Sequence, residues 1–361
     1  MMKELSDKIT KWYLENKRDL PWRKDQNPYH VWISEIMLQQ TRIEAVLSYY
    51  QRFMKELPTI ESLSKVEDDK LLKLWEGLGY YNRARNLKKA AIEIMKKYHG
   101  IFPNTFEEII SLPGIGEYTA SAISSICFSL PEVTIDGNVL RVYTRVFEDN
   151  SIIDQEKTRK QIREKLMKIV PKNSGDFNEG LMELGETICL PNGIPKCEIC
   201  PLKDLCQSRK NKTSLNYPVK NPKKEKKIEH LTVFMLIKEN KILIEKRMQE
   251  GVLQGLWQFP NINQVMTKKE VEEYCNYKNI HPIKIEKGIS YTHIFTHKKW
   301  VMNSYIITLD NKENLEGIFV TKEMMEEAYS IPGAFQPFKN DFIKRGVANE
   351  KKCRNFNIPE K

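Results

Sequence analysis

The sequence lacks any run of about twenty apolar residues, which is the length that a helix needs to span a bilayer. Its first stretch, MMKELSDKITKWYLENKRDLPW, is charged throughout and lacks the apolar core of a signal peptide. We therefore expect no membrane partner and a cytoplasmic location. Thiols stay reduced in that compartment, so disulfide bonds are disfavoured.

Cysteine is scarce outside one short stretch. The segment TICLPNGIPKCEICPLKDLC holds four of the seven cysteines, namely Cys189, Cys197, Cys200 and Cys206. Clustered cysteines in a reducing compartment more often bind metal than form disulfides, and four thiolates suit either zinc or an iron–sulfur cluster. The remaining three have no motif and are expected to be buried or spare thiols: Cys127, Cys275 and Cys353.

Positive charge is in excess. The 361 residues carry a formal net charge of +10, which suits a polyanionic partner, although many basic proteins bind no polyanion. The excess is concentrated in RKNKTSLNYPVKNPKKEKK, which has eight basic residues, one acid and two prolines. This composition is typical of a solvated linker, and it places a domain boundary at residues 209–228.

The two sides of that boundary differ in hydrophobic period. Before it, DDKLLKLWEGLG, NLKKAAIEIMKKYHG and TRKQIREKLMKIV repeat apolar residues every three or four positions and predict amphipathic helices. Asn27 and Pro28 predict the start of another helix, through YHVWISEIMLQQ. After the boundary, LTVFMLIKENKILIEKRM and ISYTHIFTHKKWVMNSYIITL each predict two strands, and KKEVEEYC predicts a helix. An all-α half therefore precedes an α/β half.

A glycine-containing turn lies inside the helical half. In EEIISLPGIGEYTASAI one helix is expected to end near Leu112 and the next to begin near Glu117. Gly114 and Gly116 would let backbone N–H groups, backed by a helix N-terminus, approach a phosphate. An ordinary helix–helix corner is the alternative, but the basic chain favours a helix-hairpin-helix DNA anchor over about residues 108–126.

Two carboxyl groups have the environments that glycosidic bond cleavage needs. Glu35 has apolar neighbours in VWISEIMLQQT, which should raise its pKa and leave it a usable acid near neutral pH. Asp136, in TIDGNVLRV, lies where an extended stretch meets a helix, whose N–H groups should favour its ionised form. A neutral acid and a carboxylate form the required pair. Without further context, a polar helix face and a simple N-cap remain the alternatives.

Five separated motifs resemble the MutY family of adenine DNA glycosylases, namely SEIMLQQT, WEGLGYYNRARNL, LPGIGEYTA, IDGNV and the cysteine stretch. In the second half, GLWQFP and FTHKKW match that family's Nudix-like domain. That family belongs to the helix-hairpin-helix superfamily of endonuclease III. The resemblance covers nearly the whole chain. It implies an all-α glycosylase domain with a six-helix barrel at residues 1–208, including an iron–sulfur loop at 189–206. An α/β Nudix-like domain would follow at 229–345, with a disordered tail at 346–361.

The resemblance also implies roles for individual residues. The four clustered cysteines would ligate a [4Fe–4S] cluster, although seven residues separate the first two where the family usually has six. Glu35 would protonate adenine at N7, and Asp136 would stabilise the oxocarbenium sugar with Asn138 nearby. Matches to the family place Arg23 and Glu179 in the pocket for the flipped base. Three further residues match positions that enter the duplex: Gln40, Thr41 and Tyr80. Helix-start packing for Tyr80 and a polar helix end for the other two are the alternatives.

The resemblance also implies the type of reaction, from Tyr118, and the choice of opposite base, from residues 295–297. Bifunctional relatives carry a lysine nucleophile where this sequence has Tyr118, so a monofunctional hydrolase is expected. Phe295, Thr296 and His297 match the family's F-S-H loop, which reads 8-oxoguanine opposite the target adenine. The Nudix hydrolase motif is missing, so pyrophosphatase activity is not expected. The predicted substrate is double-stranded DNA with A:8-oxoG or A:G mispairs, bound by a nucleoid-associated monomer.

Two other functions would also account for parts of this sequence. An endonuclease III-like glycosylase and lyase for oxidised pyrimidines is disfavoured by Tyr118 and by the C-terminal domain. A non-catalytic DNA-binding iron–sulfur redox module is disfavoured by the pair of Glu35 and Asp136.

Overall fold

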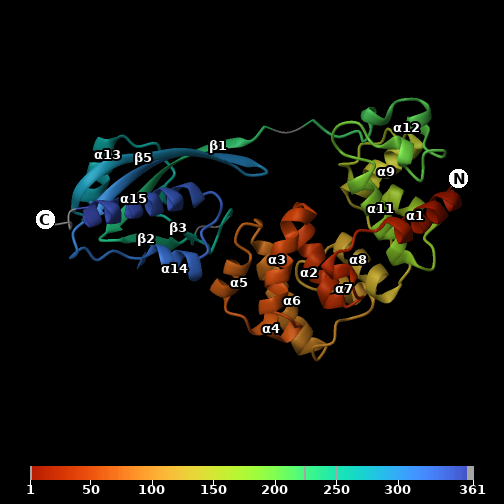
Figure 1. Cartoon of the computed structure of the whole chain (residues 1–361), viewed down its shortest axis with the longest axis horizontal. Helices are drawn as coiled ribbons and strands as arrows, with labels where there is room; N and C mark the ends of the chain where they lie inside the picture. The colour runs from red at the N-terminus through yellow and green to blue at the C-terminus, as the bar shows by residue number, and fades with distance from the viewer. Residues whose placement is uncertain (1, 223–224, 249–250, 356–361) are drawn as a thin grey trace. The chain divides into compact units, whose positions relative to one another are not determined.

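The computed structural model describes residues 2–222, 225–248 and 251–355, and its contacts divide the chain into two units (Figure 1). The first, here called the helical unit, comprises Met1–Val66 and Arg85–Lys223. The second, here called the sheet unit, comprises Glu67–Ala84 and Lys224–Lys361. Within the described ranges, no helix is both long enough and apolar enough to cross a membrane.

The helical unit contains α-helices and short 3₁₀ turns. The α-helices that lie in it wholly or in part are α1 (Met2–Asn16), α2 (Pro28–Leu38), α3 (Ile43–Glu56), α4 (Ile60–Lys65), α6 (Asn82–Lys97), α7 (Phe106–Ser111), α8 (Glu117–Phe128), α9 (Gly137–Phe147), α10 (Glu156–Met167), α11 (Ser174–Thr187) and α12 (Gln207–Lys210). The 3₁₀ turns are η1 (Pro21–Arg23), η2 (Cys197–Ile199) and η3 (Ser214–Asn216). The predicted helices in this half of the sequence are therefore confirmed, including the pair that flanks the glycine turn.

One apolar core lies at the end of the helical unit that carries the clustered cysteines. Side chains of α1, α9, α10 and α11 are buried together there, with Ile9, Leu140 and Phe177 fully enclosed. Cys189, Cys200 and Cys206 pack against the same core. The cysteine-rich loop is thereby anchored on α9 and α11, which are also the helices that follow Asp136 and carry Glu179.

The sheet unit has the mixed α/β composition that the sequence predicts. Its elements are α5 (Asp68–Leu74), β1 (Lys227–Lys238), β2 (Lys241–Lys246), β3 (Trp257–Gln258), β4 (Asn261–Ile262), α13 (Lys268–Tyr277), β5 (Pro282–Ile294), β6 (Lys298–Leu309), β7 (Ile318–Val320), α14 (Lys322–Glu327) and α15 (Gln336–Asn355). The strands run in the order β3-β2-β1-β6-β5, with β4 also pairing β1 and β7 pairing β2. β1 and β6 are parallel, and β5 and β6 form an antiparallel hairpin.

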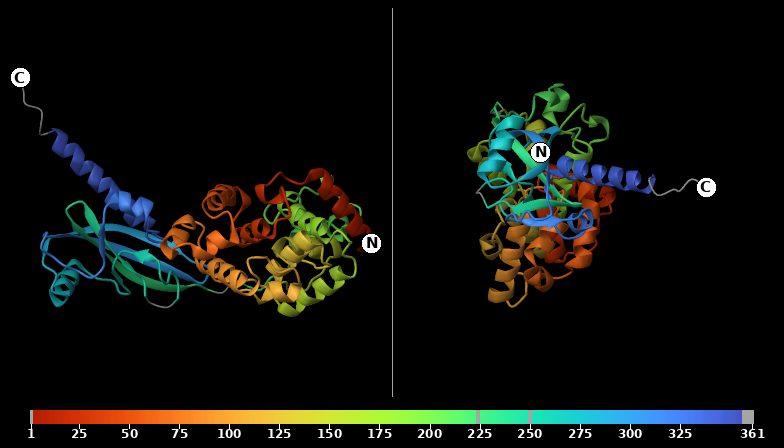
Figure 2. Two further views of the ribbon diagram at one scale, coloured as in Figure 1. Left: turned by 90° about the horizontal axis from the view of Figure 1, so that it is seen from below. Right: turned by 90° about the vertical axis from the view of Figure 1, so that its left-hand side faces the viewer.

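Alternation along β1 explains how helices cover both faces of this sheet. Val233 and Met235 join the core that includes side chains of α14 and α15, whereas Phe234 and Leu236 join the core beneath α13. Successive side chains of a strand point to opposite faces, so a strand that is apolar at every position is buried on both sides. The views in Figure 2 show α15 continuing beyond the sheet.

The observed division of the chain differs from the predicted domains in two places. Residues 67–84 were expected in the glycosylase domain, but by their contacts they belong to the sheet unit. A disordered tail was expected from residue 346, but α15 continues as a helix to Asn355. Residues 356–361 of that predicted tail lie outside the described residues.

Candidate active site

Glu35 lies on α2 in a buried setting. Asn27 caps this helix by accepting a hydrogen bond from the Tyr29 N–H at 2.9 Å, and Pro28 occupies its first turn. Glu35 then falls two turns later, where it is 6% exposed beside buried Trp32. Burial raises the pKa of Glu35 to about 7, and a hydrogen bond from Tyr118 opposes the rise. The predicted direction of this pKa shift is confirmed, and the residue is poised to donate a proton near neutral pH.

Tyr118 lies directly against that acid. Its hydroxyl donates to Glu35 Oε2 at 2.7 Å and lies 3.4 Å from the Met182 sulfur. Burial, followed by the negative charge of Glu35, raises the pKa of Tyr118 well above its usual range. Tyr118 therefore remains a neutral donor that orients the acid. The sequence identified Tyr118 only as a non-nucleophile, because nothing local predicts a contact across 83 positions.

The turn before Tyr118 has the expected helix-hairpin-helix form. α7 ends at Ser111 and α8 begins at Glu117. Gly114 has φ +77°, and a Cβ there would lie 2.5 Å from the Cβ of Asn86, so only glycine fits. Gly116, the N-cap of α8, is exposed and its first turn has no side-chain cap. These N–H groups are available to an anion.

Asp136 caps the N-terminus of α9, as predicted. It accepts hydrogen bonds from the Val139 N–H and from the Asn138 amide, both at 2.7 Å. These donors favour the ionised form, as expected. Burial outweighs them, so the pKa of Asp136 is raised overall. The charge of Asp136 also contributes to the raised pKa of Glu35, so the two carboxyl groups are electrostatically coupled.

Arg141 connects Asp136 to the cysteine-rich loop. Its guanidinium donates to Asn138 Oδ1 at 2.7 Å, and Asn138 in turn donates to Asp136. The same guanidinium donates to the carbonyl oxygens of Gly185 at 2.7 Å and Cys189 at 2.8 Å. The sequence did not identify Arg141. The only available signal was its place one turn after Asn138 on the same helix face.

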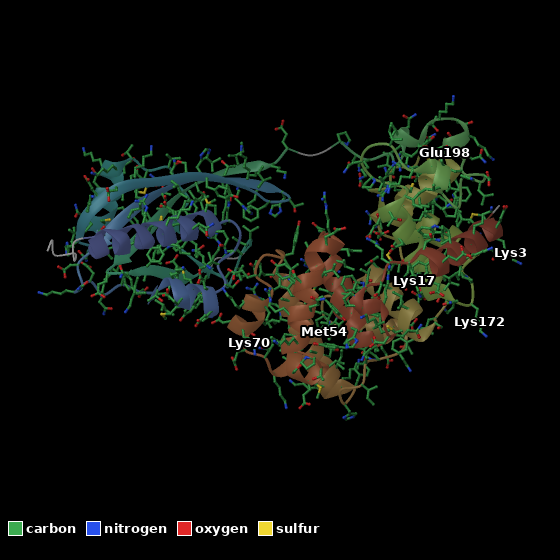
Figure 3. All side chains as sticks on the ribbon, viewed as in Figure 1. Lys3, Lys17, Met54, Lys70, Lys172 and Glu198 are labelled. Carbon is green, nitrogen blue, oxygen red and sulfur yellow. The ribbon has the colours of Figure 1, made fainter. Side chains whose placement is uncertain are left out.

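A cavity brings the predicted acid together with two predicted pocket residues. Glu35, Arg23 and Glu179 line it, and Lys17, labelled in Figure 3, lies at its wall. Arg23 donates to Glu179 at 2.8 Å and to Glu183 at 2.9 Å. These bonds fix a cation and a carboxyl group around a polar space beside the acid.

Tyr13 also lines this cavity and was not identified from the sequence. It is buried, and Arg23 lies 5.4 Å from its ring centroid. Burial, together with the charge of Glu179, raises its pKa, so it stays neutral. In the sequence, an aromatic residue at helical spacing on α1 looks the same whether its side chain lines a pocket or packs in the core.

The four clustered cysteines line one cavity between α9, α11 and their own loop. All four are free thiols, so the disulfide alternative is wrong. Arg145 donates to Cys189 Sγ at 3.3 Å and to the Leu190 carbonyl at 2.9 Å. Exposed residues of the loop include Glu198, which is paired with Arg209 at 3.1 Å (Figure 3).

The four thiols are a donor set that fits a metal group, because all four line the same cavity. Four thiolates can hold one tetrahedral zinc ion. Four thiolates can equally hold a cluster with several metal atoms, in which each sulfur binds a different iron.

The three residues expected to enter the duplex lie in different units. Gln40 and Thr41 follow the end of α2 in the helical unit, where Gln40 is exposed with φ +59°. Tyr80 belongs to the sheet unit, is 48% exposed and has φ +49°. A left-handed backbone at two exposed non-glycine residues is uncommon and often marks functional positions.

Phe295, Thr296 and His297 form the turn of the β5–β6 hairpin. The Phe295 N–H donates to the Lys298 carbonyl at 2.8 Å, which closes the turn. The Phe295 ring packs against Trp300 at 4.8 Å between centroids, whereas Thr296 and His297 are exposed. The turn is therefore anchored by Phe295 and exposes the Thr296 hydroxyl and the His297 imidazole.

Comparisons with known proteins agree with this geometry. Residues 33–172 match the HhH-GPD superfamily of base excision DNA repair proteins, and residues 232–340 match the NUDIX domain. An adenine DNA glycosylase of Buchnera aphidicola (subsp. Acyrthosiphon pisum) is 39% identical over 84% of this chain and 86% of that protein. The human adenine DNA glycosylase is 30% identical over 84% of this chain and 67% of its own length.

Solved structures resemble the helical half. A thermostable thymine-DNA glycosylase is 31% identical with a TM-score of 0.53, covering 58% of this chain and 97% of its own. Endonuclease III in a non-covalent complex with DNA is 26% identical with a TM-score of 0.50, covering 57% and 94% respectively. The chain therefore belongs to the adenine DNA glycosylase family of base excision repair proteins, with a helix-hairpin-helix glycosylase domain followed by a Nudix domain.

Proposed function

We propose that this protein hydrolyses the N-glycosidic bond of adenine mispaired with 8-oxoguanine or guanine in double-stranded DNA. The observation that carries the proposal is Glu35, which is buried beside a polar cavity and has a pKa of about 7. Adenine leaves poorly as an anion, so a neutral acid at the cavity is what its departure requires. The uncharged hydroxyl of Tyr118 keeps that acid oriented.

In the proposed mechanism, the target adenine leaves the stack and enters the cavity that Glu35, Arg23 and Glu179 line, at a cost of about a few kcal/mol. Glu35 gives its proton to N7, the bond from the sugar C1′ to N9 breaks, and the bonding electron pair stays on the departing neutral adenine. The ionised carboxylate of Asp136, held by Asn138, stabilises the positive charge on the sugar. A water oxygen then bonds to C1′, and its proton passes to a carboxylate.

Contacts to the DNA are assigned to two groups of residues. The N–H groups around Gly114 and Gly116 would bind a backbone phosphate, supported by the N-terminus of α8. Gln40, Thr41 and Tyr80 would fill the space that the flipped nucleotide leaves. We further propose that the protein acts as a monomer in the cytoplasm, associated with the nucleoid.

A single comparison tests the proposed substrate. Purified protein would be assayed in single-turnover reactions on duplexes with A:8-oxoG, A:G, A:C or thymine glycol. The proposal expects adenine release that is fastest from A:8-oxoG and no release of thymine glycol. Release of thymine glycol would favour an endonuclease III-like activity, and no release from any duplex would favour the non-catalytic module.

The cysteine cavity is proposed to hold a [4Fe–4S] cluster. Cys189, Cys197, Cys200 and Cys206 would each ligate one iron, and Arg145, which already donates to Cys189, would offset the negative charge of the thiolates. When bound, the cluster would hold the 189–206 loop in shape and would take no part in bond cleavage. The loop's own residues Lys196 and Lys203 would then be positioned toward DNA.

We predict that protein purified without oxygen is brown and contains about four irons per chain. Elemental analysis and the visible absorption spectrum measure this directly. A Cys275→Ala variant is the matched control, because Cys275 is a buried thiol in the sheet unit and should keep full iron content. One zinc per chain with no iron would refute the assignment, as would a colourless native protein without metal.

The Phe295–His297 turn is proposed to read 8-oxoguanine opposite the adenine. A hydroxyl and an imidazole can hydrogen-bond the two groups that distinguish 8-oxoguanine from guanine, which are the oxygen at C8 and the hydrogen on N7. Thr296 keeps the hydroxyl of the serine usual at this position and adds a methyl group. One or two such bonds, worth about 0.5–1.5 kcal/mol each, would supply roughly tenfold discrimination.

Replacing Thr296 and His297 together by alanine should therefore reduce the preference for A:8-oxoG over A:G by about tenfold. The maximum rate from A:G should change little, because Glu35 and Asp136 lie in the other unit. Single-turnover rates on both duplexes give the ratio. A Lys299→Ala variant in the adjacent strand controls for loss of a nearby lysine. Equal losses on both duplexes would instead assign this domain to non-specific DNA affinity.

A further inference from the structure

Segment 67–84 is attached to the rest of the sheet unit through two charged side chains on and after α5. Lys73 Nζ donates to the carbonyl oxygens of Met325 at 2.9 Å and Tyr329 at 3.2 Å. The same ammonium lies 2.6 Å from Glu76 Oε2. Both side chains are less than one-fifth exposed, so this ion pair is largely withdrawn from water. An ion pair in such a setting fixes geometry more strongly than an exposed one.

Glu76 completes the attachment with its second oxygen. Oε1 accepts hydrogen bonds from the backbone N–H of Ile331 at 2.9 Å and from the Gln336 side-chain amide at 3.1 Å. Lys339, which is buried on α15, is close enough that the charge of Glu76 opposes the lowering of its pKa by burial. Glu76 thus accepts hydrogen bonds from three separate places, and removing it would leave the buried Ile331 N–H without this acceptor and Lys73 without its anionic partner.

The turn that follows Glu76 has an unusual backbone. Gly77, Gly79 and Tyr80 have φ values of +102°, +71° and +49°, so three of four successive residues are left-handed. Trp75 Nε1 donates to the Gly79 carbonyl at 3.1 Å, and Arg83 donates to the same oxygen at 3.1 Å. The turn is therefore held in one shape by groups on either side of it, despite its two glycines.

This turn brings Tyr80 to the hairpin turn of the sheet. The Tyr80 hydroxyl lies 2.5 Å from Thr296 Oγ1, within one hydrogen bond of the residue proposed to read the opposite base. The two residues are 216 positions apart in the sequence. A residue proposed to enter the duplex and a residue proposed to recognise the lesion are thereby joined in one unit.

We propose that Lys73 and Glu76 are positioning residues for recognition of the base opposite the adenine. They act by fixing the Gly77–Tyr80 turn, so that the Tyr80 hydroxyl and the Thr296 hydroxyl form one composite reader. This inference rests on the proposed function and deepens it. It assigns part of the mispair selectivity to the ion pair of Lys73 and Glu76, which contacts neither the DNA nor the reacting bond.

Loss of this attachment should affect selectivity more than cleavage. Without Glu76, the segment that carries Tyr80 loses its hydrogen bonds to Ile331 and Gln336, so Tyr80 is held less firmly against Thr296. Discrimination should then fall by about the contribution of one hydrogen bond, or about five- to tenfold. The rate from A:G should stay within about twofold, since Glu35, Tyr118 and Asp136 belong to the helical unit and are unchanged.

The test uses the full-length protein with Glu76→Ala and Glu76→Gln. Glutamine keeps one oxygen to accept from Ile331 and Gln336 but loses the charge that pairs with Lys73, so an intermediate effect is expected. Glu61→Ala is the matched control, because Glu61 is an exposed glutamate in an (i, i+4) pair with Lys65 on α4. Single-turnover rates and dissociation constants are measured on A:8-oxoG and A:G duplexes. Amide hydrogen exchange at Ile331 reports independently whether Glu76 protects that N–H.

The expected result is faster exchange at Ile331 and a five- to tenfold smaller A:8-oxoG preference in Glu76→Ala, with partial rescue by Glu76→Gln and no change in Glu61→Ala. An unchanged preference despite faster exchange would overturn the inference, and so would equal losses on both duplexes. If Glu76→Ala fails to fold, the comparison of Glu76→Gln with wild type decides in the same way. Wild-type protein that releases no adenine from either duplex would refute the proposed function instead.

Discussion

Replacing Glu35 by glutamine lowers the single-turnover rate of adenine release by at least about 10²–10⁴, the range typical of general acid catalysis. Glutamine has the same shape and can still accept the hydrogen bond that Tyr118 donates at 2.7 Å, but it has no carboxylic proton to give. The measurement is base release from an A:8-oxoG duplex with enzyme in excess. Affinity for the same duplex should hardly change, which separates loss of the acid from loss of binding.

The pH dependence of the wild type follows from the same group. Glu35 has to be protonated to act, and its pKa is about 7, so the rate should fall about tenfold per pH unit above that value. Asp136 has to be ionised, and its pKa is raised by burial, so the rate should also fall on the acid side. Together the two carboxyl groups predict a bell-shaped profile. In Glu35→Gln the alkaline limb should disappear from the residual rate.

The exposed residue Glu61 supplies the control for this experiment. Glu61→Gln makes the same chemical change on the surface of α4, where the carboxyl group pairs with Lys65, and it should keep the wild-type rate and pH profile. Near-normal excision by Glu35→Gln would show that another group protonates the base. The assignment of Glu35 as the acid would then be withdrawn.

Local sequence signals were sufficient to predict the elements that carry the site. The proline after Asn27 and the glycine turn before Glu117 predicted where α2 and α8 begin, since caps and turns depend on a few adjacent residues. The pattern of ISYTHIFTHKKWVMNSYIITL likewise predicted the two strands β5 and β6, whereas the loop that holds Thr296 was implied by the family resemblance. In each case the determining interactions lie within a few positions of one another.

Tertiary effects explain what the sequence did not predict. The N-cap of Asp136 was predicted, but the direction of its pKa shift was not, because the shift is dominated by burial that other helices create. An amphipathic pattern predicted a helix at α5, but such a pattern does not say which apolar surface the helix will cover. The packing of residues 67–84 in the sheet unit, through Lys73 and Glu76, could therefore not be predicted from the sequence.

Tyr118→Lys should convert the proposed hydrolase into an enzyme that also forms a covalent adduct with DNA. An uncharged lysine amine near the sugar bonds to C1′ as the protonated base departs with the bonding electron pair. The C1′–O4′ bond then opens, O4′ takes up a proton, and the resulting imine can be reduced with borohydride. Wild type has only the tyrosine hydroxyl at this position, and burial keeps its pKa well above the usual range, so it should give no such adduct. Adduct formation and strand cleavage are read on a denaturing gel.

Because Tyr118 lies against Glu35, the same substitution should also slow adenine release, which the motif alone does not predict. Its hydroxyl is 2.7 Å from Glu35, so a lysine there places an ammonium beside the carboxyl group and lowers the pKa of Glu35 from about 7. A decrease of about two units would reduce the protonated fraction at pH 7 from roughly half to roughly 1%, so adenine release should slow by about fiftyfold. Trapping should therefore be compared on A:8-oxoG and on a duplex with a preformed abasic site, where no base has to leave.

The variant should trap well on the abasic duplex and slowly on A:8-oxoG, which separates the gain of a nucleophile from the loss of the acid. Tyr118→Phe is the matched control, because it keeps the ring, introduces no amine and should form no adduct on either duplex. Equal trapping by wild type and Tyr118→Lys on the abasic duplex would mean that another amine already reaches the sugar. The proposed role of Tyr118 would then be wrong, because the neutral Tyr118 hydroxyl does not stop an amine of another residue from attacking the sugar.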